Sequence, residues 1–252
     1  MKILALNGSH RGEAGCTQWL LNKIAEGAVE AGGEFETVVL ASQRIKPCAG
    51  CEACNKVHPL QCIYEQEDDV AAIFNKMKAA DILIFATPVY VFSISGLMKT
   101  FIDRFNSTLG GEGNLCLTES GLIFHRVDKG FHSKPFVVLT CCGNVEAETV
   151  KNVVSYFKTF SRFVDAPIVG VLVRNLIGMM GIGETQEGVQ PKPVIAEVTA
   201  AYVQAGRELV RQGRIASRTQ KQANQHILGI PFLDLLMKSR FFKKMALKRH
   251  QT

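Results

Sequence analysis

The stretch that decides the fold is KILALN (residues 2–7), followed by GSHRGEAGCT (residues 8–17). The first six residues form a mainly apolar run of strand length. A small polar loop then leads into a helix expected over residues 17–31, where apolar residues recur at helical spacing. Strand, polar loop and helix together form the first half of a βαβ unit.

The loop between this strand and this helix favours a single phosphate group. Hydroxyls and backbone N–H groups at a helix N-terminus attract anions, because the unpaired donors and the helix dipole both favour negative charge. The loop has neither the Gly-x-Gly-x-x-Gly pattern of dinucleotide sites nor the lysine of a P-loop. A terminal monophosphate therefore suits it better than a pyrophosphate. The alternative is an ordinary turn capped by Thr17.

Four more apolar runs predict strands later in the chain, over residues 35–40, 81–86, 135–141 and 167–173. Continuous apolar runs are typical of parallel strands covered on both faces. The expected fold class is α/β, a three-layer doubly wound five-stranded parallel sheet, in which ligands bind beyond the carboxyl ends of the strands. Further helices are expected from Asp68 or Asp69 to Met77 and over residues 95–105, 146–163 and 194–212.

Composition and charge narrow the class of protein. The hydrophobic fraction of 47% suffices for a full core, and no run of 18 apolar residues predicts a membrane span. A strand at the very start argues against a signal peptide, and eight cysteines fit a reducing, cytoplasmic location. Residues 214–252 hold nine Lys/Arg and one Asp, so they carry 9 − 1 = +8, and the remainder carries 6 − 8 = −2. The body is therefore not expected to bind nucleic acid.

We expect one domain over residues 1–213, with a cysteine-rich insert at 46–66 and a long loop at 107–133, followed by a basic amphipathic helical tail at 214–252. The tail ends in an amphipathic piece at 231–248. It could dock on a partner subunit, an anionic membrane surface or an acidic electron carrier. The favoured interpretation is a docked helix with a solvated basic face.

The loop after the third strand, TPVYVFSISG (residues 87–96), combines proline with aromatic residues. Such a loop suits a flat heteroaromatic ring, because an aromatic side chain can stack on the ring while main-chain groups meet its edge. The small residues of TCCGN (140–144) could border the other edge. The alternative is a surface turn whose aromatic residues pack on a neighbour or a dimer partner.

Several motifs together resemble the flavodoxin-like NAD(P)H-dependent FMN reductase superfamily: NGSHR (7–11) with Thr17, TPVY (87–90), GLMK (96–99) and IDR (102–104). The similarity covers about residues 1–175. It implies bound FMN, which carries the chemistry, so no catalytic side chain is expected. By position in these motifs, the resemblance assigns the phosphate to Ser9, His10, Arg11, Thr17 and Gln18, one side of the ring to Pro88, Val89, Tyr90, Phe92 and Ser93, and its other side to Cys142, Gly143 and Asn144.

Four cysteines within the insert have the spacing Cys-x2-Cys-x2-Cys-x7-Cys: Cys48, Cys51, Cys54 and Cys62. Gly50 lets the backbone turn between the first two. Four thiolates can ligate a 4Fe–4S cluster, and this compact spacing resembles that of the iron–sulfur flavoprotein branch. Two alternatives stay open. Related cluster-free reductases carry a similar stretch as free thiols, and zinc also accepts four thiolates.

The expected function is that of an FMN-dependent oxidoreductase or electron-transfer flavoprotein with a 4Fe–4S cluster. The resemblance implies NAD(P)H or ferredoxin as donor, a small-molecule acceptor and a homodimer or homotetramer. One alternative is a cluster-free NAD(P)H-dependent FMN or quinone reductase. Another, from a different class, is a non-enzymatic flavin carrier or a four-cysteine metal-binding module.

Overall fold

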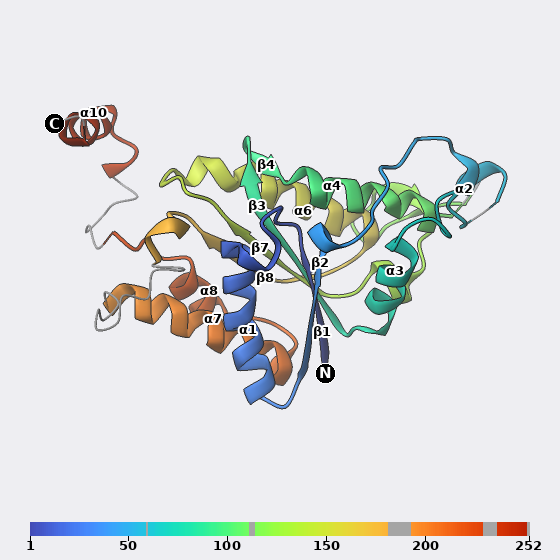
Figure 1. Cartoon of the computed structure of the whole chain (residues 1–252), viewed down its shortest axis with the longest axis horizontal. Helices are drawn as coiled ribbons and strands as arrows, with labels where there is room; N and C mark the ends of the chain where they lie inside the picture. Colours follow the sequence, from blue (N-terminus) through green and yellow to red (C-terminus); the bar gives the residue numbers. More distant parts are fainter. Residues whose placement is uncertain (59, 111–113, 181–192, 229–235, 251–252) are drawn as a thin grey trace.

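A computed structural model describes residues 1–58, 60–110, 114–180, 193–228 and 236–250. Its central sheet is built from β1 (Lys2–Asn7), β2 (Glu34–Val39), β3 (Ile82–Tyr90), β7 (Phe136–Cys141) and β8 (Ile168–Arg174). These strands lie in the order β2-β1-β3-β7-β8, and each pair of neighbours is parallel (Figure 1). The predicted doubly wound α/β sheet is thus confirmed. Its carboxyl edge gathers the ends of β1, β3 and β7.

Helices cover both faces of this sheet, as the period-2 alternation of strand side chains requires. In β1, Ile3 and Ala5 join the core beneath α1 (Cys16–Glu30) and α7 (Pro193–Gln212). Leu4 and Leu6 point the other way, into the core formed with α3 (Val70–Ala79), α4 (Gly96–Asp103) and α6 (Lys151–Val164). Shorter elements are α2 (Ala53–Lys56), η1 (Gly12–Ala14), η2 (Leu40–Ser42), η3 (Arg104–Thr108), η4 (Ala147–Val150) and η5 (Ile177–Met180).

The structure corrects the expected loop after the third strand. β3 continues to Tyr90, and β4 (Ser93–Ile94) folds back against it as an antiparallel hairpin. The tip residues Val91 and Phe92 have φ of +46° and +63°. Two consecutive left-handed residues build a tight turn, although neither residue type is usual there. The turn was therefore not apparent from composition.

The expected long loop at 107–133 also contains regular structure. Its described part includes β5 (Leu115–Leu117) and β6 (Ile123–His125), which form an antiparallel pair, and α5 (Lys129–His132). Strands of three residues are too short to produce a recognisable period.

Beyond α7, helix α8 (Ser217–Ala223) lies against the outer strand β8. Gln220 Oε1 accepts a hydrogen bond of 2.8 Å from the backbone N–H of Val171, and Asn224 Oδ1 accepts one of 2.7 Å from that of Val173. These side chains cover a sheet edge that would otherwise expose unpaired groups. The predicted boundary at 213 stays a proposal.

The chain ends in α10 (Arg240–His250), which projects at the top left of Figure 1. Parts of the glycine-rich segment at 174–192 and of the amphipathic piece at 231–248 lie outside the described residues. No described helix is both long enough and apolar enough to cross a bilayer.

Helices α1 and α7 approach each other at two glycines. A Cβ added to Gly27 would lie 1.7 Å from the carbonyl oxygen of Val203, and one added to Gly206 would lie 1.9 Å from that of Ile24. Real Cβ atoms do not come so close, so the two backbones touch directly at these positions. This contact fixes the position of α1, whose first turn borders the carboxyl edge.

We predict that Gly206→Ala forces α1 and α7 apart and lowers the free energy of unfolding by roughly 1–3 kcal/mol, the usual cost of overpacking. Chemical denaturation monitored by circular dichroism measures this change. Gly178→Ala is the matched control, because a Cβ at Gly178 would meet no atom within 4 Å. Equal stability of the two variants would contradict the close-contact interpretation.

Candidate active site

The loop after β1 is fastened by Asn7, which is completely buried. Its Oδ1 accepts a 2.9 Å hydrogen bond from the backbone N–H of Ser9, and its Nδ2 donates to Gln18 Oε1 at 2.9 Å and to the carbonyl of Gly12 at 3.4 Å. Gly12 has φ of +53°, which favours glycine at this turn. Asn7 thus connects the strand end, the loop and the helix. Sequence reasoning used it as part of a motif but assigned it no role.

The N-terminus of α1 is open to an anion. Its N-cap is Gly15, which provides no side-chain cap, so the first N–H groups of the helix lack that partner. Ser9 is buried, and its Oγ accepts a 3.3 Å hydrogen bond from the N–H of Arg11. The Arg11 side chain is exposed and has no ion-pair partner in the described part of the chain. Backbone donors, a hydroxyl and a cation therefore lie close together at this helix start.

Two predicted phosphate residues direct their side chains elsewhere. Thr17 is buried, and its hydroxyl lies 3.5 Å from Cys141 Sγ. Gln18 is bonded to Asn7, as described, and donates from Nε2 to Asn22 at 2.8 Å. At both positions it is the backbone N–H, within the first turn of α1, that faces the predicted site. His10 lies near the second loop, with its ring centroid 6.0 Å from that of Tyr90.

Ser95 and Thr87 lock the second loop to the first. The Ser95 hydroxyl donates a 2.6 Å hydrogen bond to the carbonyl of Gly8 and accepts one of 3.1 Å from the N–H of Met98, so it also caps α4. The Ser95 N–H donates to Thr87 Oγ1 at 3.0 Å. Both side chains are fully buried. Sequence reasoning missed this role, although a serine before a helix is a common N-cap signal.

The β3–β4 hairpin presents an apolar rim beside this lock. Tyr90, Val91 and Phe92 are 41%, 89% and 60% exposed. Non-glycine residues held at positive φ store strain, and such strain is concentrated at binding sites. Among the predicted ring residues, Ser93 is exposed on this rim and Val89 is half-buried, whereas Pro88 is buried within β3.

The third loop follows β7 and presents small, polar groups. Cys142 is buried, and its Sγ lies 3.4 Å from the carbonyl of Asn144 and 3.5 Å from Asn175 Oδ1. Burial raises the pKa of the Cys142 thiol, so this residue stays protonated at neutral pH. Gly143 and Asn144 are exposed at the edge. The structure thus places all three predicted loops at the carboxyl edge of neighbouring strands.

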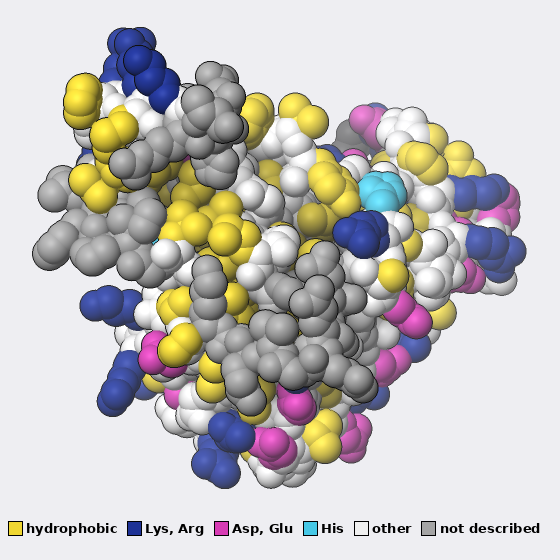
Figure 2. All heavy atoms as spheres, turned by 60° about the vertical axis from the view of Figure 1, so that its left-hand side comes forward, with side chains coloured by type: hydrophobic (Ala, Val, Ile, Leu, Met, Phe, Trp, Pro, Cys, Tyr) yellow, Lys and Arg dark blue, Asp and Glu magenta, His cyan; other side chains and the backbone are white. Residues whose placement is uncertain are grey.

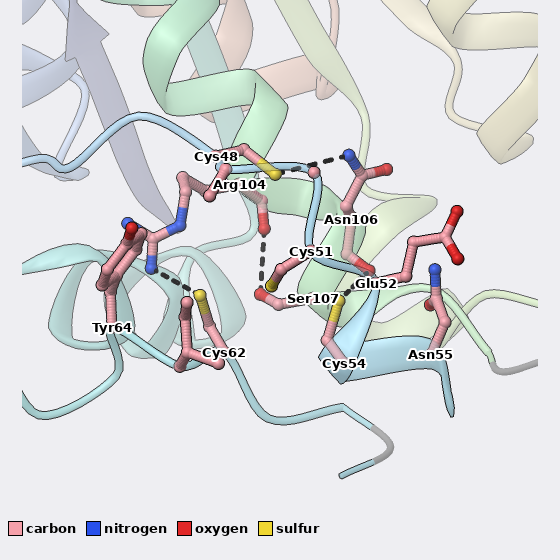
Figure 3. Close-up of a pocket in the computed structure, with 13 residues that line it drawn as sticks. Cys48, Cys51, Glu52, Cys54, Asn55, Cys62, Tyr64, Arg104, Asn106 and Ser107 are labelled. Atoms are coloured by element: carbon pink, nitrogen blue, oxygen red, sulfur yellow. Dashed lines mark hydrogen bonds between the residues drawn. The ribbon is translucent and has the colours of Figure 1, made fainter. Parts of the chain in front are cut away.

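The four cysteines of the insert line one cavity of about 240 Å³ (Figure 3). The chain turns there at Gly50 and Glu52, with φ of +63° and +56°. All four thiols are free. Four thiols around one space form the donor set that a 4Fe–4S cluster requires. In the described part of the chain, however, no three His, Cys, Asp or Glu side chains are close enough together to hold a metal ion.

The side chain of Arg104 lines this cavity. Its guanidinium pairs with Asp68, donates to the carbonyl of Lys46 at 3.0 Å and donates to Cys62 Sγ at 3.1 Å. The Arg104 and Asp68 side chains are 2% and 0% exposed. Burial is the largest single effect and lowers the pKa of Arg104, but the hydrogen bonds and charges of Asp68 and Cys62 together outweigh burial and raise that pKa. A permanent cation therefore lies beside one thiol.

Asn106, which lies with Arg104 in the short helix η3, contacts two further cysteines. Its Nδ2 lies 3.9 Å from Cys48 Sγ, and its carbonyl lies 3.6 Å from Cys54 Sγ. Burial, and then the neighbouring thiols Cys62, Cys48 and Cys51, raise the pKa of Cys54. The four thiols interact electrostatically because they line the same cavity. A bound metal would reverse the rise in pKa by favouring thiolates.

The chain is similar in sequence to proteins named as flavoproteins or FMN-containing oxidoreductases. It is 39% identical over 104 residues to an iron–sulfur flavoprotein of Archaeoglobus fulgidus, covering 41% of this chain and 48% of that protein. It is 36% identical over 110 residues to the putative NAD(P)H-dependent FMN-containing oxidoreductase YwqN of Bacillus subtilis, covering 43% of this chain and 54% of that protein. The chain thus spans about half the length of the curated relatives it matches.

Solved structures show the same fold at low sequence identity. An FMN-dependent NADH-azoreductase of Bacillus anthracis superimposes with a TM-score of 0.58 at 14% identity, over 84% of this chain and 100% of that one. An NAD(P)H:quinone oxidoreductase of Methanothermobacter marburgensis gives 0.54 at 17% identity, over 85% and 99%. A model of the family described as "NADPH-dependent FMN reductase" matches residues 1–172, more than half of the chain. The chain therefore belongs to the NADPH-dependent FMN reductase family.

Proposed function

We propose that this chain is an FMN-dependent oxidoreductase that binds its flavin across the carboxyl edge of β1, β3 and β7. The observation that carries the proposal is the open N-terminus of α1, where backbone N–H groups, the Ser9 hydroxyl and Arg11 lie together. These groups would hold the terminal phosphate, as helix N-termini do. The family match supports FMN as the cofactor.

The isoalloxazine ring would then lie between the two remaining loops. Tyr90 and Phe92 offer exposed aromatic surface on one side, and Gly143 with Asn144 offers backbone and amide groups on the other. Bound FMN supplies hydride and electron transfer, while the protein positions it and limits access of water. Ser95 contributes by holding the first two loops at a fixed separation.

We further propose that Cys48, Cys51, Cys54 and Cys62 ligate a 4Fe–4S cluster. Their common cavity and the N–H donors of Arg104 and Asn106 support this assignment, as do the names of the iron–sulfur flavoproteins among the relatives. Binding would draw the four sulfurs closer together than they lie here. The second candidate function is a cluster-free reductase. It is favoured by the lack of a ready metal-binding group among the described residues.

The proposed reaction partners follow from the family. NAD(P)H is the proposed electron donor, since the family is named for an NADPH-dependent reaction. Ferredoxin is a proposed alternative partner if the cluster is present, because a cluster exchanges single electrons. The acceptor would be a small molecule. A homodimer or homotetramer is proposed as the assembly.

We predict that Ser9→Ala weakens FMN binding by about 10- to 100-fold, since a charge-assisted hydrogen bond contributes roughly 1.5–3 kcal/mol. Quenching of flavin fluorescence on titration with the apoprotein gives the dissociation constant. Ser155→Ala, at an exposed site on α6, is the matched control and should bind FMN normally. Undiminished FMN affinity in Ser9→Ala would count against the assigned phosphate loop.

We predict that Cys51→Ala abolishes the cluster and leaves the flavin bound, because the three remaining thiols cannot complete the ligand set. Anaerobic purification with assays of iron, acid-labile sulfide and flavin tests this, with about four irons per chain expected in the unaltered protein. Cys116→Ala removes a cysteine outside the insert and should keep all the iron. Flavin without iron in the unaltered protein would instead favour the cluster-free reductase.

We predict that the double variant Asp68→Asn/Arg104→Gln lowers the midpoint potential of the cluster. The double substitution removes the cation beside Cys62 Sγ. That cation favours the reduced state of the cluster, which is more negative than the oxidised state. Because Asp68 is neutralised as well, no unpaired buried charge is left. Spectroelectrochemical titration separates the cluster potential from that of the flavin. An unchanged cluster potential, with full iron content, would show that Arg104 does not influence the redox centre.

A further inference from the structure

Helix α10 exposes both basic and apolar side chains. Its ion pair with the body is formed by Lys243 with Glu146, at 2.6 Å. Phe241 is 78% exposed and Met245 is 42% exposed. An amphipathic helix of a monomeric protein normally turns its apolar side inward. Here Lys243 faces the body, Phe241 and Met245 face outward, and Phe242 is half-buried, so only part of the apolar side is turned inward.

Three further charged side chains of α10 are directed to solvent. Arg240, Lys244 and Lys248 are exposed and recur at a spacing of four residues, so they form one basic stripe along the helix. Phe241 and Met245 follow the same spacing beside this stripe. Figure 2 shows Lys/Arg and hydrophobic side chains side by side at the projecting end of the molecule. The exposed surface of α10 is thus both basic and apolar.

Packing between α10 and the body is loose. A cavity of about 670 Å³ lies between the body and the segment that leads into α10. Met237, Lys238 and Lys243 line it on one side, and Glu146 and Lys151 line it on the other. A helix of 11 residues is marginal in water without tertiary support. An additional surface would therefore stabilise α10.

We propose that α10 docks on an anionic membrane surface. Such a surface provides both properties that the helix requires: negative headgroups for Arg240, Lys244 and Lys248, and an apolar boundary for Phe241 and Met245. The charge distribution agrees, because residues 214–252 carry 9 − 1 = +8 while the remainder carries 6 − 8 = −2. The body is therefore not attracted to the lipid, and α10 orients the molecule there.

Flotation of the full chain with lipid vesicles tests this proposal. We expect binding to vesicles of equal parts phosphatidylcholine and phosphatidylglycerol, no binding to phosphatidylcholine alone, and weaker binding as salt increases. Each basic residue near such a surface contributes roughly fivefold in partitioning. Lys244→Glu/Lys248→Glu should therefore weaken binding by at least about 25-fold, and Phe241→Ser should weaken it by about tenfold.

Lys129→Glu/Lys158→Glu is the matched control, since it changes net charge equally at exposed positions outside the tail and should bind almost normally. Hydrogen exchange in residues 240–250 should slow when anionic vesicles are added. Equal binding by both double variants would overturn the proposal. An absence of vesicle binding would also overturn the proposal. In that case a concentration-dependent dimer would show that α10 mediates self-association. Salt-dependent binding of soluble polyglutamate would instead show that α10 binds an acidic protein partner.

Discussion

The arrangement of the candidate site depends on one buried amide, that of Asn7. Its side chain pairs with Ser9, Gln18 and Gly12, and so holds the first loop against the start of α1. These hydrogen bonds hold the loop in place beside the start of α1, where the first N–H groups of the helix have no side-chain cap. Ser95 then joins this loop to the next through the carbonyl of Gly8. The groups of the proposed anion site are thus held in place by the fold itself.

A second buried pair organises the cysteine insert in the same manner. Asp68 accepts hydrogen bonds from the N–H of Lys46 at 3.0 Å and from that of Val70 at 3.2 Å, while Arg104 holds the carbonyl of Lys46 and the thiol of Cys62. Both ends of the insert are therefore attached to one ion pair. Breaking a buried pair by removing one partner is costly, so this attachment is also a rigid support for any group that the four thiols bind.

Most of the fold could be predicted from sequence, because apolar strands such as Lys2–Asn7 and Phe136–Cys141 are long and separated by helical periods. The family match and the strand order confirm the predicted superfamily. The candidate site was predicted less completely. A sequence shows that Thr17 lies at the loop, but side-chain packing decides that its hydroxyl turns toward Cys141. The hairpin at Val91 and the role of Ser95 likewise depend on tertiary contacts, and the site assignments stay predictions.

The central claim is that the start of α1 binds the phosphate of a mononucleotide. The most direct measurement compares the affinities of the apoprotein for FMN and for riboflavin, which differ only in that phosphate. If two or more charge-assisted hydrogen bonds hold the group, FMN should bind at least about 100-fold more tightly than riboflavin. Equal affinity for the two flavins would contradict the account.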